Sequence, residues 1–181
     1  MTGSGECDKI TPVMEMDQPK RKQIRLEHYD YSQPGAYFIT ICADRRAQIF
    51  GSVCRGDPCG RPEVRLAPLG RIAEQTLSEM EARFGITILQ SVIMPNHVHF
   101  VYSVERATAR VAPTVGRVVG AYKSLVVNRW RTECNRSNLS MGRVWQRNFY
   151  EHVIRNEREL QACLEYIQTN PARWDSDEYF A

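Results

Sequence analysis

Two β-rich runs separated by only two residues constrain the fold of this chain more than any other feature. Residues 86–94 and 97–104 are rich in Ile, Val, Phe and Tyr, and Pro95 and Asn96 stand between them. Residues of these types favour strands, and a Pro-Asn pair favours a tight connection. The two runs therefore predict an antiparallel pair of strands joined by a short turn, and the rest of the fold has to be arranged around it.

Further strands are predicted upstream of this pair. Residues 37–42, YFITIC, have the β-branched and aromatic content of a central strand. Residues 51–62 are rich in Gly and Pro and predict a loop, and a short strand over residues 64–66 follows it.

Helical periodicity accounts for most of what remains. Apolar residues at three- and four-residue steps predict helices over residues 68–84 and 113–131. Asn148 with Glu151, and Asn156 with Glu159, each resemble a capping box, which predicts a short helix over residues 148–155 and a longer one over residues 157–169. Strands and helices alternate irregularly, so the fold class is α+β, an antiparallel sheet with helices packed on it.

Length and composition favour one soluble domain. We expect residues 1–28 to form a flexible basic arm, residues 29–174 a single domain and residues 175–181 a C-terminal tail. No apolar run approaches the roughly 20 residues that a membrane span needs, and no secretory signal is evident, so a cytoplasmic protein is expected.

The net charge of +3 is unevenly distributed. Residues 106–147 contain nine basic residues and one acidic residue, Glu133, so this segment alone carries +8. A one-sided excess of positive charge is expected of a surface that follows a phosphate backbone. The segment therefore favours a nucleic acid as the partner.

A histidine pair marks the start of the second β-rich run. His97 and His99 are two residues apart, so on a strand both imidazoles project from the same face and could share one metal ion. Asn96, just before them, could simply make the turn. A zinc hydrolase built on this pair would lack an evident third ligand and a nearby glutamate base.

Tyr150 is the candidate nucleophile. In the predicted helix over residues 148–155 it would lie in the first turn, where free backbone N–H groups and the helix dipole favour a phenolate or a phosphate. Tyrosine is among the side chains that form covalent intermediates. The alternative is an aromatic that fills a gap between helix and sheet, as Trp145 and Phe149 could.

Three segments together resemble one known family. The strings MPNHVHFVY, GAYKSLVVNRW and VWQRNFYEHVIRNERELQACLEYIQTNPARW are similar to those of the single-tyrosine HUH transposases, specifically the REP-associated tyrosine transposases of the insertion-sequence-200-like group. The resemblance extends from about Tyr29 to Trp174 and keeps the order of the motifs. It implies a ferredoxin-like HUH fold.

The resemblance also implies a reaction. His97 and His99 would hold Mg²⁺ or Mn²⁺, and Tyr150 would attack a phosphate of single-stranded or hairpin DNA to form a 5′-phosphotyrosine. A second 3′-OH could then reverse the step on another strand. The opposing hypothesis is a catalytically idle module that binds DNA or RNA hairpins through its basic segment.

The third metal ligand and the candidate DNA contacts each have two interpretations. Related enzymes often place a polar third ligand one helical turn after the tyrosine, where this chain has Ile154; His152 is the nearest substitute, but a helix would turn it about 200° per two residues away from Tyr150. Candidate DNA contacts are Lys123, Arg117, Arg131, Arg147 and Trp145, with a solvated lysine and a core tryptophan as the alternatives. Monomer and homodimer both remain open.

Overall fold

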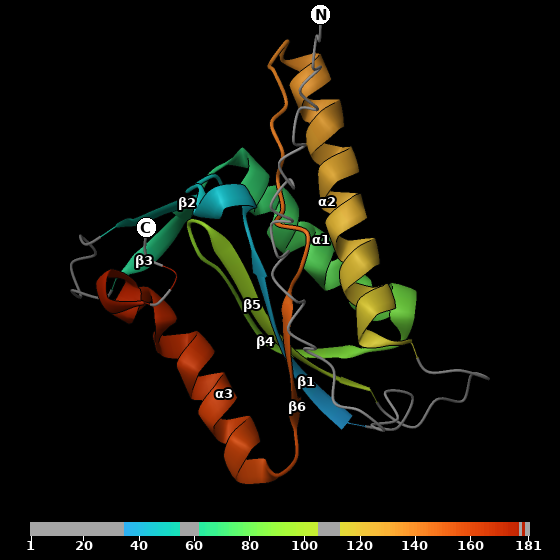
Figure 1. The fold of residues 1–181 in the computed structure, drawn as a ribbon, viewed down its shortest axis with the longest axis vertical. Helices are drawn as coiled ribbons and strands as arrows, with labels where there is room; N and C mark the ends of the chain where they lie inside the picture. The colour runs from blue at the N-terminus through green and yellow to red at the C-terminus, as the bar shows by residue number, and fades with distance from the viewer. Residues whose placement is uncertain (1–34, 55–61, 105–112, 178, 180–181) are drawn as a thin grey trace, which may run out of the picture.

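A four-stranded antiparallel sheet forms the centre of the computed structural model, which describes residues 35–54, 62–104, 113–177 and 179 (Figure 1). Its strands lie in the order β4-β5-β1-β6. Their bounds are Thr87–Ile93 for β4, His97–Val104 for β5, Gly35–Cys42 for β1 and Tyr150–Ile154 for β6. The strands β5 and β1 are therefore central, whereas β6 is an edge strand.

The predicted antiparallel pair is confirmed as the hairpin β4–β5. Residues 94–96 connect the two strands, and the amide of Met94 donates to the carbonyl of His97 at 2.8 Å. The next strand beside β5 is β1, which comes from the predicted YFITIC run. β5 is almost completely buried because helices cover the sheet on both faces.

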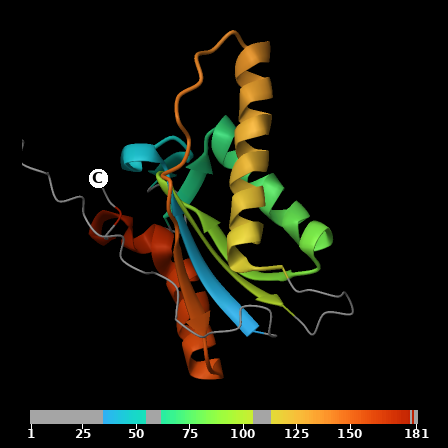
Figure 2. The same ribbon diagram turned by 45° about the vertical axis from the view of Figure 1, so that its right-hand side comes forward.

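The helices divide between the two faces of the sheet, as Figures 1 and 2 show. Helices α1 (Pro68–Phe84) and α2 (Val115–Arg136) pack on one face, where Ile39, Phe100 and Tyr122 belong to the larger apolar cluster. Helix α3 (Glu157–Thr169) covers the other face over a smaller cluster. The predicted α+β class is thus confirmed, with one apolar layer on each side of the sheet.

Local signals in the sequence explain where two helices begin and end. Gly85 ends α1 in the left-handed conformation, with φ of 61°, which favours glycine. Asn156 caps α3, since its side-chain oxygen accepts from the amide of Glu159 at 2.9 Å. The carboxylate of Glu159 accepts in return from the amide of Arg155, so the predicted second capping box is present in a slightly shifted form.

Two short 3₁₀ turns and a small second sheet complete the described chain. The turns are the 3₁₀ segments Asp44–Arg46 and Asn170–Ser176. The second sheet pairs β2 (Gly51–Cys54) with β3 (Glu63–Leu66). The strand predicted at residues 64–66 is confirmed, whereas the loop predicted over residues 51–62 was wrong at its start, because Gly51–Cys54 pairs with β3.

The predicted short helix over residues 148–155 was also wrong. Residues 150–154 form β6, which pairs antiparallel with β1 from Tyr150 opposite Thr40 to Ile154 opposite Ala36. The free edge of β1 supplies a ladder of hydrogen bonds, and the alternating pattern of YEHVI buries Glu151 and Val153 on the face of α2. Tertiary pairing therefore outweighs the local capping signal at Asn148.

The described helices include none that is long and apolar enough to cross a membrane. The predicted arm over residues 1–28 lies outside the described residues, as do Arg106 and Arg110 of the basic segment.

Candidate active site

The histidine pair lies at the start of β5, on the face covered by α3. His97 and His99 both project from this face, whereas Val98 between them belongs to the apolar cluster under α1 and α2. The two ring centroids are 4.4 Å apart, and both side chains are at most 1% exposed. The predicted projection of the two imidazoles from one face is confirmed.

Hydrogen bonds fix the orientation of both rings. Asn96 Oδ1 lies 2.8 Å from His97 Nδ1, and Asn96 Nδ2 donates to the carbonyl of Tyr179 at 2.7 Å. A carbonyl only accepts, so this second bond settles which end of the Asn96 amide faces His97. An amide oxygen also only accepts, so the hydrogen of the neutral His97 ring is on Nδ1 and its Nε2 keeps a lone pair.

The second ring has a comparable partner on β1. Thr40 Oγ1 lies 2.8 Å from His99 Nδ1, and Thr40 stands directly opposite His99 in the strand register. The Nε2 atoms of His97 and His99 are buried and have no hydrogen-bond partner among the described residues. Two unpartnered buried nitrogens on adjacent rings are costly unless a ligand uses them.

An acidic side chain completes a possible metal centre. Asp177 offers a carboxylate oxygen in a group with His97 and His99 whose ligand atoms all lie within 4.8 Å of one another. The carboxylate is itself held, since Asp177 Oδ2 accepts from Asn170 Nδ2 and Asp177 Oδ1 accepts from the amide of Tyr179, both at 2.7 Å. Imidazole nitrogens suit softer divalent ions better than they suit Mg²⁺ or Mn²⁺, whereas a carboxylate oxygen suits Mg²⁺ and Mn²⁺ well. Both imidazole and carboxylate side chains are nevertheless known ligands of divalent metals.

Both imidazoles are neutral near pH 7. The pKa of His97 is lowered to about 4, and burial is the main cause. Two smaller effects are included: the Asp177 carboxylate raises this pKa, and Arg46 lowers it. Burial, followed by the neighbouring His97, also lowers the pKa of His99. A neutral imidazole is the form that binds a metal, so no proton has to leave before an ion enters.

Tyr179 packs over the two histidines. Its ring centroid lies 4.7 Å from that of His97 and 5.7 Å from that of His99, and the guanidinium carbon of Arg46 lies over the same ring, 5.4 Å from its centroid. The stretch predicted as a C-terminal tail, residues 175–181, therefore contributes both Asp177 and Tyr179 to the site. No signal in the sequence pointed to either of them, because neither has a fixed spacing to the histidine motif.

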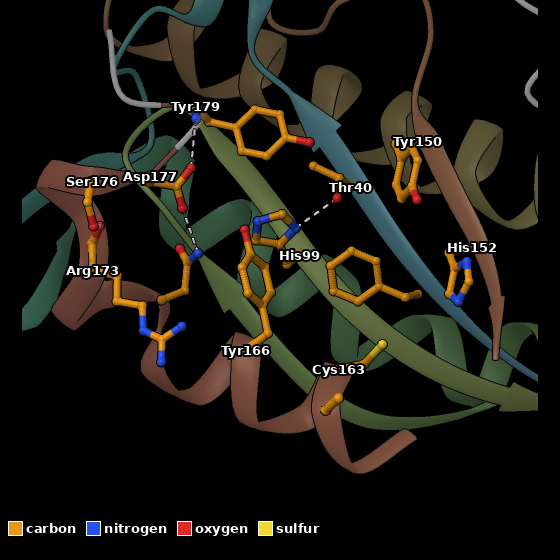
Figure 3. A pocket seen from close by; sticks show the side chains of 13 residues that line it. Thr40, His99, Tyr150, His152, Cys163, Tyr166, Arg173, Ser176, Asp177 and Tyr179 are labelled. Carbon is orange, nitrogen blue, oxygen red and sulfur yellow. Dashed lines mark hydrogen bonds between the residues drawn. The ribbon is translucent and has the colours of Figure 1, made fainter. Parts of the chain in front are cut away.

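Tyr150 reaches the same face of the sheet from β6. In the strand register Tyr150 stands opposite Thr40, which in turn stands opposite His99. Two strand spacings separate the Tyr150 and His99 backbones by roughly 10 Å. Tyr150, His99 and Asp177 all line one cavity of about 870 Å³ between the sheet and α3 (Figure 3).

The environment of Tyr150 differs from the one predicted. Because Tyr150 begins a strand and not a helix, the predicted helix does not supply free N–H groups or a dipole beside its hydroxyl, and that expectation was wrong. Its side chain is 49% exposed, in contrast to the buried histidines. The phenol is therefore accessible to a substrate that enters the cavity from solvent.

His152 lies on the same face as Tyr150. The prediction that it points away was wrong, because residues two apart on a strand project together (Figure 3). Its Nε2 lies 3.5 Å from Glu159 Oε2 at the start of α3. Among the described residues His152 does not belong to the histidine-aspartate group, and Asp177 occupies the place of the third candidate ligand.

Most of the residues in this arrangement lie in a segment that matches a known family; Asp177 and Tyr179 follow that segment. The family model described as "Transposase IS200 like" matches residues 35–170. This chain belongs to the IS200-like transposases. The family resemblance inferred from the three sequence motifs is thereby confirmed.

Similar proteins agree with this assignment. A protein of Haemophilus influenzae with no assigned function is 33% identical over 178 residues, which cover 88% of this chain and 93% of the relative. A second protein of the same organism, named as a candidate REP-associated tyrosine transposase, is 28% identical over 86 residues, 45% of this chain and 47% of that protein.

One solved structure is similar to this transposase over most of its length. It is that of a REP-associated tyrosine transposase bound to a REP hairpin, with a TM-score of 0.52, 18% identity and coverage of 82% of this chain and 74% of the other. At this identity the likeness shows a shared fold.

The candidate DNA contacts of this transposase lie in different surroundings. Arg117, Arg131 and Arg147 are exposed. Trp145 is buried, with its ring centroid 4.9 Å from that of Phe50, which agrees with the core alternative and leaves little of its surface for a nucleic-acid base. Lys123 donates to main-chain carbonyls, so it is not the solvated lysine of the other alternative.

Proposed function

We propose that this transposase cuts and rejoins single-stranded DNA beside a hairpin, with Tyr150 as the nucleophile and His97, His99 and Asp177 as the residues that hold a divalent metal ion. The observation that carries the proposal is the shared cavity. Tyr150 and His99 line it together with Asp177, although they come from three separate elements of the chain.

The three proposed ligands fit a metal because their ligand atoms converge. The Nε2 atoms of both histidines are buried without a partner among the described residues, and one ligand atom each of His97, His99 and Asp177 lie within 4.8 Å of one another. A bound Mg²⁺ or Mn²⁺ would offset the negative charge that develops on the scissile phosphate. Asn96 and Thr40 would hold the imidazoles in the orientation that this requires.

Tyr150 would carry out the covalent step. Its phenol oxygen forms a bond to the phosphorus while the bond from phosphorus to the 3′-oxygen of the neighbouring nucleotide breaks. Water takes the phenolic proton, since the side chain is half exposed, and water also protonates the departing 3′-oxygen. The products are a 5′-phosphotyrosine and a free 3′-OH, and attack by another 3′-OH rejoins the DNA without ATP.

DNA is the proposed partner, and a hairpin its proposed shape. The positive segment of residues 106–147 supports binding to a phosphate backbone, with Arg117, Arg131 and Arg147 as exposed contacts. The similar solved transposase is described as bound to a REP hairpin, which supports the same class of substrate.

A covalent-adduct assay tests the proposal. A hairpin oligonucleotide that carries a label at its 3′ end is incubated with the protein and Mn²⁺, because a 5′-phosphotyrosine leaves the 3′ fragment, and hence the label, on the protein. We expect a labelled band under denaturing conditions with the native protein. The band should disappear with chelator and with Tyr150→Phe.

A matched control separates the nucleophile from other tyrosines. Tyr102→Phe removes a phenol on the opposite face of the sheet and should keep the adduct. An adduct that persists in Tyr150→Phe would refute the assignment of the nucleophile. Salt-sensitive hairpin binding with no adduct in the native protein would instead favour the idle binding module.

A further inference from the structure

Lys123 on α2 makes an unusual set of hydrogen bonds just ahead of Tyr150. Its ammonium donates to the carbonyls of Gln146 at 2.9 Å, Arg147 at 3.4 Å and Asn148 at 3.0 Å. An ammonium has three N–H groups, so three consecutive carbonyls satisfy all of them. No N–H group of Lys123 is then left for a phosphate.

The three carbonyls belong to an irregularity in the pairing with β1. An isolated bridge joins Ala43 to Trp145, and the amide of Gln146 donates to the carbonyl of Cys42. The regular ladder resumes with Thr40 opposite Tyr150. From bridge to ladder the chain advances by three residues on the β1 side and by five on the other, so two extra residues bulge out before Tyr150.

Such a bulge leaves carbonyls outside the ladder and changes the direction of the strand that follows it. Here the Lys123 ammonium takes the place of the missing cross-strand donors. Its Nζ also lies 5.8 Å from the centre of the Phe149 ring, which packs against the larger apolar cluster. The path of residues 146–149 is therefore held from the side of α2, and in Figure 1 this segment comes down beside α2 before it enters β6.

The position of the bulge sets the position of the nucleophile. Tyr150 is the first residue of an edge strand, and its side chain is 49% exposed, so few side-chain contacts restrain it. Its place relative to the histidines depends on the backbone that precedes it. Misplacement of a reacting group by about 1 Å can lower a rate by about 100-fold.

We propose that Lys123 is a positioning residue, which fixes the two-residue bulge before β6 and thereby aims Tyr150 at the phosphate in the cavity. The role in aiming rests on the proposed function. The restraint of the bulge by Lys123 does not depend on the proposed function, and it can be tested without any reaction.

The protonation of Lys123 agrees with this role at neutral pH. Burial lowers the pKa of Lys123 to about 8, with a smaller opposing effect from Cys42. At pH 7 the side chain is still an ammonium with three donors.

The test compares Lys123→Met with Lys123→Arg. Methionine keeps the length of the stem and removes all three donors, whereas arginine keeps the charge but replaces the three-point geometry with a planar fork. Arg129→Met is the matched control, since Arg129 is another hydrogen-bonded cation of α2, but it bonds Thr76 and Glu79 of α1 and not the bulge.

Two measurements are made on each variant. Hydrogen exchange of the peptide that covers residues 146–150 reports whether Lys123 restrains the bulge. The single-turnover rate of adduct formation with saturating hairpin and Mn²⁺ reports whether Tyr150 is correctly placed for the reaction. For Lys123→Met we expect faster exchange in this peptide and a rate lower by about 10- to 100-fold, with hairpin affinity within about twofold of the native value. Lys123→Arg should recover less than half of the lost rate on a logarithmic scale, and Arg129→Met should resemble the native protein in both measurements.

Other outcomes overturn the proposal. Unchanged exchange in Lys123→Met would show that Lys123 does not hold the bulge, and faster exchange with an unchanged rate would show that the bulge does not aim Tyr150. Weaker hairpin binding with a smaller salt dependence, fully restored by Lys123→Arg, would identify a phosphate contact. If the native protein itself forms no adduct, the proposed function fails, and exchange alone decides whether Lys123 restrains the bulge.

Discussion

Replacement of Asn96 by leucine should weaken metal binding although Asn96 is not a ligand. Its Oδ1 holds the hydrogen of His97 on Nδ1, and its Nδ2 donates to the carbonyl of Tyr179. Leucine has the same branching and a similar size, but it neither accepts nor donates. In Asn96→Leu the His97 ring can take its other tautomer, in which Nε2 carries the hydrogen and cannot bind an ion.

The magnitude follows from the burial of these groups. Asn96 and His97 are at most 1% exposed, so water cannot replace the lost acceptor. Loss of a hydrogen bond that orients a metal-binding histidine usually lowers affinity by about 10- to 100-fold, which corresponds to about 1.4 to 2.8 kcal/mol. Without metal, an unsatisfied buried N–H should lower the free energy of unfolding by about 1 to 3 kcal/mol.

Calorimetric titration with Mn²⁺ measures the affinity, and thermal unfolding with chelator measures the stability of the metal-free protein. Asn96→Asp is the informative companion, since its carboxylate still accepts from His97 Nδ1 but cannot donate to Tyr179. It should keep the Mn²⁺ affinity within a few-fold while losing stability. Asn128→Leu, at an exposed position of α2, controls for the substitution itself. Native Mn²⁺ affinity in Asn96→Leu would refute the reasoning and leave Asn96 as a residue that only makes the turn.

Three further outcomes are expected. Asp177→Asn should lower the Mn²⁺ affinity at least about 10-fold in the same titration, whereas Asp175→Asn should leave the affinity near the native value. Equal effects of the two substitutions would refute the assignment of Asp177 as a metal ligand. In the metal-free protein the contribution of His97 to the free energy of unfolding should fall by about 3 kcal/mol as the pH drops from 6.5 to 4, because the unfolded chain binds a proton at His97 before the folded chain does. The pKa of His99 is lowered as well, so the total fall should be larger, and denaturant titrations of His97→Gln should show a smaller fall than the native protein. Gly120→Ala on α2 should raise the melting temperature, since no atom lies within 4 Å of the added Cβ. Gly70→Ala on α1 should lower the melting temperature strongly, since its Cβ would clash with the carbonyl oxygen of Phe50. The opposite order of melting temperatures would contradict the packing of α1.

The fold was predictable wherever side-chain pattern and local chain signals agree. The β4–β5 hairpin has both the β-rich runs and the Pro95-Asn96 connection, and α1 has both its apolar stripe and Gly85 at its end. The prediction failed at β6, where a local capping pattern at Asn148 competes with a partner strand that lies more than a hundred residues earlier in the chain. Periodicity over five residues cannot decide such a case, because pairing across the sheet supplies the deciding energy.

The site was predictable to the extent that it rests on neighbouring residues. His97 and His99 follow from the i and i+2 rule on a strand, and Tyr150 followed from the family resemblance. Asp177 and Thr40 did not follow, since each meets the histidines only through the tertiary fold. Lys123 was a candidate DNA contact because the family resemblance suggests that it faces DNA, whereas the carbonyls that it binds became visible only in the structure.

The error at β6 also bears on the third ligand, which the sequence suggested one helical turn after Tyr150. In a helix, Ile154 would lie one turn above Tyr150 and beside it, but on a strand four residues span about 13 Å, and Ile154 packs with Phe38 and Val101 under α3. The third ligand that we propose comes instead from a different part of the chain, on the face of the histidines. α3 covers that face, and the chain that leaves α3 passes the start of β5, where His97 lies. An acidic residue shortly after α3 is therefore the expected source of a carboxylate in this fold, and Asp177 is such a residue. Once β6 is known to be a strand, the same reasoning applies to related sequences in which the fourth position after the tyrosine is apolar, as Ile154 is here.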